Sequence, residues 1–116
     1  MIGRWDLKAN PVYFKKHQIE WIFEWQVDIL GLNPNHLYIT VFKGDPSVGI
    51  DRDDEAIQIW TELFKAKNID PKIEEDGEIY GTSRGGRIFL YDANENWWSR
   101  SGQPKNMPIG ELGGPD

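Results

Sequence analysis

The 116-residue chain contains no cysteine, and its two histidines stand far apart, at positions 17 and 36. Without cysteine the chain forms no disulfide, has no thiol nucleophile and offers no cysteine-based zinc site. Two isolated histidines also argue against a histidine-rich site. We therefore predict that the chain holds no metal site.

The chain is also short of basic residues and of long apolar runs. Thirteen Lys and Arg stand against nineteen Asp and Glu, which gives a formal net charge of −6. Because binding to a phosphate backbone needs a basic surface, we expect the chain alone to bind nucleic acid poorly. No apolar run approaches a membrane span, and residues 1–8 lack the apolar core of a signal peptide. These absences predict a cytoplasmic protein with no membrane partner.

The apolar residues that are present are enough for one modest core. They make up 39% of the chain and include six Trp and five Phe. At this length we predict a single domain over residues 1–116. Proline and glycine dominate residues 102–116, which indicates an irregular tail.

Two helices are predicted. Asn10 is a suitable N-cap before Pro11, and the following apolar residues of Val12–Leu30 occupy more than one stripe, so we expect a largely buried helix that includes Trp25. Asp51 is the expected cap of the second helix, and residues 53–55 place acidic side chains in its first turn. This acidic cluster lacks the alternating oxygens of a calcium loop, so a solvated helix start explains it better. The apolar positions of the second helix are Ala56, Ile57, Ile59, Trp60, Leu63 and Phe64.

The remaining regular segments are predicted as strands. Leu37–Phe42 is apolar on both faces, which favours an interior strand, and Gly86–Asp92 indicates a buried one. Pro71 precedes Lys72–Glu75 and favours an edge strand there, with another short strand at Glu78–Tyr80. The acidic residues of positions 74–78 have no partner nearby in the sequence, so we interpret them as surface charge rather than general acids. The expected fold is α+β, with two helices packed on a small, mainly antiparallel sheet.

The strongest candidate site follows the last predicted strand. Asn96, Trp97 and Trp98 precede Arg100 and a glycine-rich, acidic end. An indole offers a flat wall and one N–H donor, and the backbone near glycines can approach a ligand closely. The alternative is that both tryptophans are packing residues and the glycines form turns, and the residue types alone favour this alternative.

A family resemblance extends over nearly the whole chain. In order and at similar spacing, its segments resemble one continuous part of the catalytic domain of alanyl-tRNA synthetase, a class II family. The segments are Met1–Leu7, Tyr13–Lys16, Leu37–Phe42, Asp53–Ala56 with Ile59 and Trp60, Asn96–Trp98 and Gly113–Asp116.

The first of these segments carries the ATP positions that the resemblance implies. In the family an M-x-G-x-W/F stretch closes the second class II motif. It corresponds here to Met1, Gly3 and Trp5, which are implied to bind ATP.

The last two segments carry the implied substrate positions. A tryptophan in an N-[FW]-W run lines the family's amino-acid pocket and corresponds to Trp98, beside Asn96 and Trp97. Residues 113–116 resemble the family's C-G-P-[CD]-[ST]-E run, with Gly113 where cysteine is common. The resemblance therefore implies substrate contacts at Gly113, Gly114 and Asp116 as well.

The activity implied by the resemblance is ATP-dependent activation of alanine and its transfer to tRNA, with ATP and Mg²⁺ as cofactors. The family's first motif, its second-motif arginine and its whole third motif have no counterpart in these 116 residues. We therefore expect an internal fragment with no catalytic residue, inactive alone, that binds neither cofactor tightly and does not bind tRNA. Two alternatives stay open: a stand-alone module that binds a small molecule or nucleotide, and an interaction domain whose exposed sheet edge pairs with a second copy as a homodimer.

Overall fold

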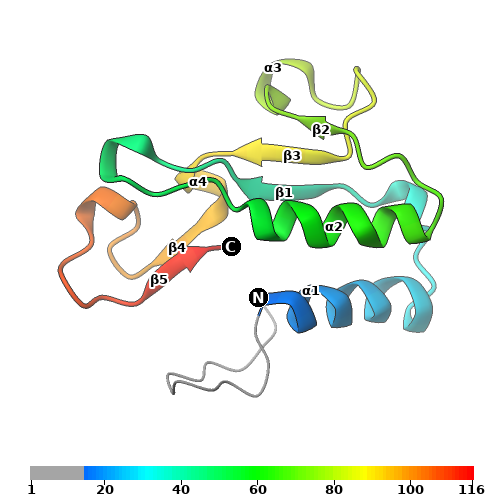
Figure 1. Cartoon of the computed structure of the whole chain (residues 1–116), viewed down its shortest axis with the longest axis horizontal. Helices are drawn as coiled ribbons and strands as arrows, with labels where there is room; N and C mark the ends of the chain where they lie inside the picture. The colour runs from blue at the N-terminus through cyan, green and yellow to red at the C-terminus, as the bar shows by residue number, and fades with distance from the viewer. Residues whose placement is uncertain (1–14) are drawn as a thin grey trace.

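The computed structural model describes residues 15–116, and it confirms an α+β fold (Figure 1). Helix α1 continues directly into a π-helical turn, and three short 3₁₀ turns lie in the connections. The elements are α1 (Lys15–Glu24), the π-turn (Trp25–Ile29), β1 (Ile39–Phe42), α2 (Asp54–Ala66), β2 (Ile73–Glu74), α3 (Gly77–Tyr80), β3 (Ile88–Tyr91), α4 (Ala93–Asn96), β4 (Trp97–Ser99) and β5 (Gly113–Pro115).

The main sheet is parallel, so the prediction of a mainly antiparallel sheet is wrong. Its strand order is β1-β3-β2, and both neighbouring pairs run parallel. Parallel strands need a long crossover connection, and α2 supplies one between β1 and β2. Only the separate two-stranded ribbon of β4 and β5 is antiparallel.

The strand order also changes the expected position of two strands. β3 is the central strand, whereas β1 stands at one end of the three-stranded order, so the prediction of an interior strand at Leu37–Phe42 is wrong. β2 is an edge strand, as Pro71 indicated.

Three short segments differ from their predicted form. Residues 78–80 belong to α3 rather than to a strand, and residues 113–115 of the expected irregular tail form β5. Asp53, not Asp51, caps α2, because its carboxylate accepts a 3.1 Å hydrogen bond from the Ala56 amide. The predicted cap at Asn10 and Pro11 lies outside the described residues.

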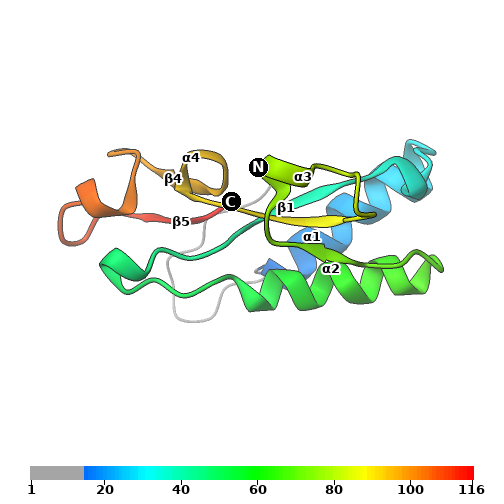
Figure 2. The same ribbon diagram turned by 90° about the horizontal axis from the view of Figure 1, so that it is seen from above.

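One face of the main sheet carries the apolar core. α2 covers this face, and α1 packs alongside α2 (Figures 1 and 2). Phe23 of α1 meets the rings of Trp60 and Phe64 edge-on, with centroids 6.0 and 6.1 Å apart. Trp60 is buried as predicted. The buried members of the core are Phe23, Val41, Ala56, Ile57, Trp60, Phe64, Ile69, Ile88 and Leu90.

The prediction that Trp25 is largely buried is wrong. Its side chain is 42% exposed, at the start of the π-helical turn. Within residues 15–116, no helix combines the length and the apolar character required to cross a membrane.

Glu74 corrects the interpretation of residues 74–78 as surface charge. Its side chain is fully buried, and both its oxygens lie 2.9 Å from guanidinium nitrogens of Arg84. Arg84 also lies over the ring of Tyr80, 4.0 Å from the centroid. Because an unpaired buried carboxylate is costly, this ion pair holds the segment between β2 and β3 against the sheet. The neighbouring acids Glu75, Asp76 and Glu78 are exposed, as predicted.

Candidate functional site

The β4–β5 ribbon brings together two segments that the sequence marks as one site. In its antiparallel register Trp98 pairs with Gly114, and Ser99 pairs with Gly113. The short helix α4 turns the chain from β3 into β4, and Asp92 caps it by accepting a 2.8 Å hydrogen bond from the Asn94 amide. The ribbon therefore extends from the end of the main sheet (Figure 1).

Gly113 allows the two ribbon strands to approach closely. A Cβ at this position would lie 2.7 Å from the main-chain oxygen of Trp98 and 2.9 Å from the Cβ of Ser99. Because the first of these atoms belongs to the backbone, a larger residue would move β5 away from β4. At Gly114, in contrast, an added Cβ meets nothing within 4 Å, so this backbone is accessible beside Trp98.

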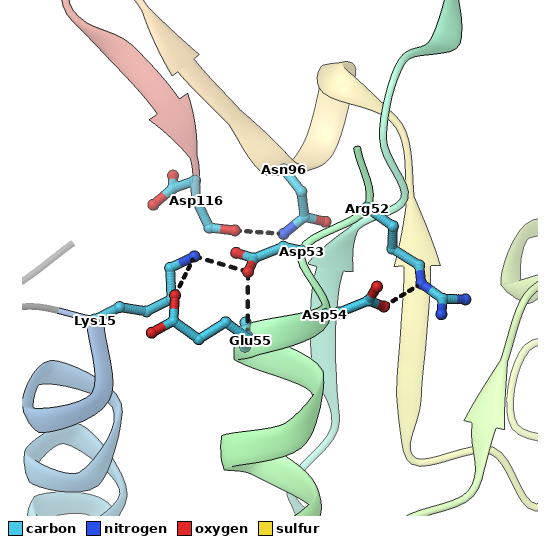
Figure 3. Close-up of polar contacts among 8 residues, drawn as sticks. Lys15, Arg52, Asp53, Asp54, Glu55, Asn96 and Asp116 are labelled. Carbon is cyan, nitrogen blue, oxygen red and sulfur yellow. Dashed lines mark hydrogen bonds and ion pairs between the residues drawn. The ribbon is translucent and has the colours of Figure 1, made fainter. Parts of the chain in front are cut away.

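Asn96 ties the ribbon to the main sheet. Its buried side-chain amide donates to Thr40 Oγ1 on β1 at 3.0 Å and to the main-chain oxygen of Asp116 at 2.8 Å. The Asp116 amide in turn donates to the main-chain oxygen of Asn96 at 3.1 Å. Figure 3 shows the bond from the Asn96 side chain to Asp116. Both side-chain N–H groups of Asn96 are therefore used within the protein. Its Oδ1 is buried and has no hydrogen-bond partner among residues 15–116.

The two tryptophans of the ribbon have different surroundings. The Trp97 ring packs against Phe42 of β1 with centroids 5.2 Å apart, whereas Trp98 is 42% exposed. Successive strand residues point to opposite faces, so the two indoles do not form one continuous wall. Trp98 is the indole that is accessible to a ligand.

The start of α2 lies close to the end of the ribbon (Figure 3). Lys15 Nζ approaches the carboxylates of Asp53 and Glu55 at 2.7 and 3.4 Å, and Arg52 pairs with Asp54 at 2.6 Å. Residues 53–55 do lie at the helix start, as predicted, but these cations neutralise them in part. The Lys15–Asp53 contact was missed because its partners are 38 residues apart in the sequence.

The described residues contain no group of three or more His, Asp or Glu side chains arranged to hold a metal ion. The proposed ATP positions Met1, Gly3 and Trp5 lie outside the part of the chain that the structure describes. The substrate positions that the structure does bring together are therefore Trp98, Gly113, Gly114 and, through Asn96, Asp116.

We expect Asn96→Asp to loosen the ribbon. The substitution keeps the size of the side chain but places an oxygen where the amide donated to Asp116, and an unsatisfied buried acceptor costs about 1–3 kcal/mol. Urea unfolding should report this loss, and hydrogen exchange should accelerate at the Asp116 amide. Thr40→Val removes only the bond to β1 and is the control, with a smaller effect expected on Asp116. Equal hydrogen exchange at the Asp116 amide in the native, Asn96→Asp and Thr40→Val chains would contradict this role of Asn96.

Comparison with known proteins relates the chain to short stretches of one kind of enzyme. No protein-family model matches the chain. It is 45% identical over 69 residues to the alanine–tRNA ligase of Porphyromonas gingivalis, a match that covers 60% of this chain and 8% of the ligase. Its homologues are alanine–tRNA ligases.

Two further relatives extend the matched region. The cytoplasmic alanine–tRNA ligase of Dictyostelium discoideum is 28% identical over 112 residues, or 97% of this chain and 10% of that protein. The alanine–tRNA ligase of Prochlorococcus marinus is 32% identical over 87 residues, covering 75% of this chain and 7% of the ligase. The chain thus spans a tenth or less of the length of these relatives. It is related to a short stretch of each of them.

Proposed function

We propose that the chain corresponds to part of the class II catalytic domain of an alanine–tRNA ligase and that it carries one wall of the alanine pocket at Trp98. The observation that carries this proposal is the ribbon register, in which Trp98 lies opposite Gly114. The resemblance assigns both residues to substrate binding from separate motifs. The fold brings them into direct pairing.

Each residue of the site has a physical role in this proposal. The exposed indole of Trp98 gives an apolar surface for a small side chain such as the methyl group of alanine. The open backbone at Gly114 allows close approach to polar groups of the same ligand. Asn96 is a positioning residue, since it holds Asp116 and with it β5 beside Trp98.

The proposal does not give the chain a catalytic step of its own. Apart from the implied ATP positions Met1, Gly3 and Trp5, the contacts to ATP and Mg²⁺ would come from the parent enzyme's other motifs, and the described residues hold no acidic cluster that fits a metal ion. A net charge of −6 also disfavours tRNA binding by this chain alone. The Dictyostelium relative is named as a cytoplasmic enzyme, and we propose that this chain is cytoplasmic as well.

Titration with a non-hydrolysable alanyl-adenylate analogue tests this proposal. We expect weak binding, in roughly the millimolar range, because only one wall of the pocket is supplied. Amide shifts followed by NMR should cluster at Trp98 and across the ribbon at Gly113 and Gly114, and Trp98→Ala should abolish them. Trp25→Ala is the matched control, because Trp25 has the same 42% exposure but lies on another element.

Two outcomes would overturn the proposed pocket. One is the absence of shifts at saturating analogue, which would leave Trp98 a packing residue. The other is equal loss of binding in the Trp98→Ala and Trp25→Ala chains, which would indicate non-specific contact with exposed indoles. Shifts caused equally well by AMP alone would support a nucleotide-binding module instead.

A further inference from the structure

The segment between β2 and β3 closes on itself, and we name residues 72–87 the β2–β3 loop. At its ends the Lys72 oxygen accepts a 2.8 Å hydrogen bond from the Arg87 amide. Inside it, the buried carboxylate of Glu74 is held by Arg84. The loop carries α3 and projects beyond β3 in Figure 1. A loop with adjoining ends that is packed by its own side chains can open as one unit while the rest of the domain stays folded.

The β2–β3 loop contains the one Asp–Gly step of the sequence. Asp76 precedes Gly77, and no Asn–Gly step occurs among the 116 residues. Since glycine has no side chain to shield its main-chain nitrogen, that nitrogen can attack the carboxyl carbon of the preceding aspartate. Asp76 is exposed, and although it stands at the N-cap of α3, its carboxylate accepts no capping hydrogen bond. The step therefore has the residue types and the uncapped carboxyl group that rearrangement to isoaspartate requires.

The rearrangement passes through a succinimide ring. The Gly77 nitrogen forms a bond to Cγ of Asp76, and its proton leaves with the hydroxyl of the protonated carboxyl group as water. A second water molecule then opens the ring. Attack at Cγ restores aspartate, whereas attack at the main-chain carbonyl carbon gives isoaspartate, whose main chain runs through Cβ and Cγ and is one carbon longer. Neither step needs an oxidant, a reductant or a cofactor.

The native backbone holds the two reacting atoms apart. The ψ angle of Asp76 is 47°, and the N and Cβ branches of an L-residue lie about 120° apart around the Cα–C bond, so the Cβ lies almost opposite the Gly77 nitrogen. Ring closure needs both on the same side. Rotation to that position would break the bonds that the Asp76 oxygen accepts from the Ile79 and Tyr80 amides, both at 3.0 Å. Cyclisation therefore requires the β2–β3 loop to open.

The rearranged chain would not fit back into the closed loop. A Cβ added at Gly77 would lie 2.8 Å from Cδ1 of Phe89 and 3.1 Å from the hydroxyl of Tyr91, both on the central strand β3. An additional main-chain carbon just before Gly77 meets the same crowding. The Asp76 amide also donates to Glu74 at 3.1 Å, and a lengthened chain would move that amide away from the buried carboxylate. Once formed, isoaspartate should keep the loop open.

We propose that Asp76 is a site of isoaspartate formation and that the Glu74–Arg84 ion pair limits its rate by holding the β2–β3 loop closed. Loss of Arg84 would leave a buried carboxylate without its cation, which favours the open loop. Because loop opening is fast relative to covalent rearrangement, the rate should follow the fraction of chains with an open loop. This proposal is independent of the alanine pocket, which lies on the ribbon.

Incubation at neutral pH and body temperature, in water enriched in the heavy isotope of oxygen, measures the rearrangement. Opening of the succinimide adds one heavy oxygen to Asp76, which mass spectrometry of the peptide that contains it detects. Methylation by an isoaspartyl methyltransferase then identifies the isoaspartate product. We expect slow labelling in the native chain and labelling that is about tenfold faster or more in Arg84→Ala. Arg84→Lys retains a cation beside Glu74 and should give an intermediate rate.

Lys67→Ala is the matched control. It removes the cation of another ion pair, in which Lys67 Nζ lies 3.1 Å from Asp28, away from the β2–β3 loop. This variant should label Asp76 at the native rate. Equal acceleration in Lys67→Ala and Arg84→Ala would overturn the specific role of the Glu74–Arg84 pair.

Hydrogen exchange separates opening of the loop from unfolding of the whole domain. In Arg84→Ala the Arg87 amide, which bonds Lys72 across the ends of the loop, should exchange faster. The Lys43 amide donates to β3 from the end of β1 at 2.8 Å and should change much less. Equal acceleration at both amides would show that Arg84 stabilises the whole domain, which would overturn its control of the loop.

The labelling rates give two further decisive outcomes. Absence of label at Asp76 in the chain unfolded by urea would overturn the site itself, because the open segment would then not rearrange. A native chain that labels as fast as the urea-unfolded chain would overturn the protection by the closed loop. If Arg84→Ala speeds exchange at the Arg87 amide but not labelling at Asp76, the ion pair does not limit the rearrangement.

Discussion

Trp60→Ala should lower the free energy of unfolding by about 3–5 kcal/mol, the largest stability change that we expect from any single substitution in this chain. Trp60 lies where the two long helices meet, with its ring 6.0 Å from Phe23 and 6.2 Å from Phe64. Only 8% of the residue is exposed. Truncation removes the apolar contacts and leaves a cavity that α1, α2 and the sheet cannot all close.

Urea unfolding followed by far-ultraviolet circular dichroism measures this change. Domains of this kind are stable by about 5–15 kcal/mol, so a loss of this size removes a large part of the stability and should shift the unfolding midpoint to lower urea concentration. Trp25→Ala is the matched control, because it removes an indole that is 42% exposed. We expect it to cost less than about 1 kcal/mol. An unchanged unfolding midpoint in Trp60→Ala would show that α2 does not pack as described.

Local sequence patterns predicted the long elements well. Apolar spacing and glycine boundaries placed α2, β1 and β3 and the described part of the first helix, because these segments bury a continuous face. Strand direction could not be obtained in this way. The sequence of Ile88–Tyr91 is compatible with either direction, and β3 becomes the parallel centre of the sheet only through its pairing with strands on both sides.

Three residues show what local patterns miss. Trp25 follows the exposed Trp21 by four residues and lies two positions from the buried Phe23, on the opposite side of the helix, a difference that its apolar side chain did not reveal in the sequence. Glu74 is one acid in a charged segment, and its burial depends on Arg84, ten residues later. The cap of α2 was predicted at Asp51, whereas the bond from the Ala56 amide identifies Asp53.

The candidate site was only partly accessible to sequence reasoning. Residue types and the family resemblance identified Trp98 and Gly114, but not that they are paired across a ribbon. Asn96 was predicted to contact substrate, and its bonds to Thr40 and Asp116 depend on residues 56 and 20 positions away. Contacts over such distances are a property of the fold rather than of any local pattern.

The second large effect concerns catalysis: the 116-residue chain should show no alanine-dependent exchange of labelled pyrophosphate into ATP. Formation of an adenylate releases pyrophosphate, whose developing negative charge must be stabilised by cationic donors. Loss of a single well-placed donor of this kind typically costs about 100- to 1,000-fold in rate. Without the family's second-motif arginine and its third motif, turnover should fall below detection.

Three of the four arginines within residues 15–116 are already held by contacts inside the protein. Arg84 is paired with the buried Glu74, and Arg52 with Asp54. Arg87 donates to the main-chain oxygens of residues 35 and 37 at 2.7 and 2.9 Å, and its guanidinium lies over the Tyr38 ring. Moving any of these side chains to a phosphate would break the contacts that hold them.

The exchange assay needs a control for ligase carried over from the expression host. We therefore propose to measure the native chain, Trp98→Ala and Arg100→Ala side by side at high chain concentration, with a complete alanine–tRNA ligase as the positive standard. Exchange equal in all three chains would indicate a contaminant, which leaves the chain inactive as expected. Exchange in the native chain that Trp98→Ala abolishes would contradict the expectation, and its dependence on Arg100 would then identify that exposed arginine as the missing cationic donor.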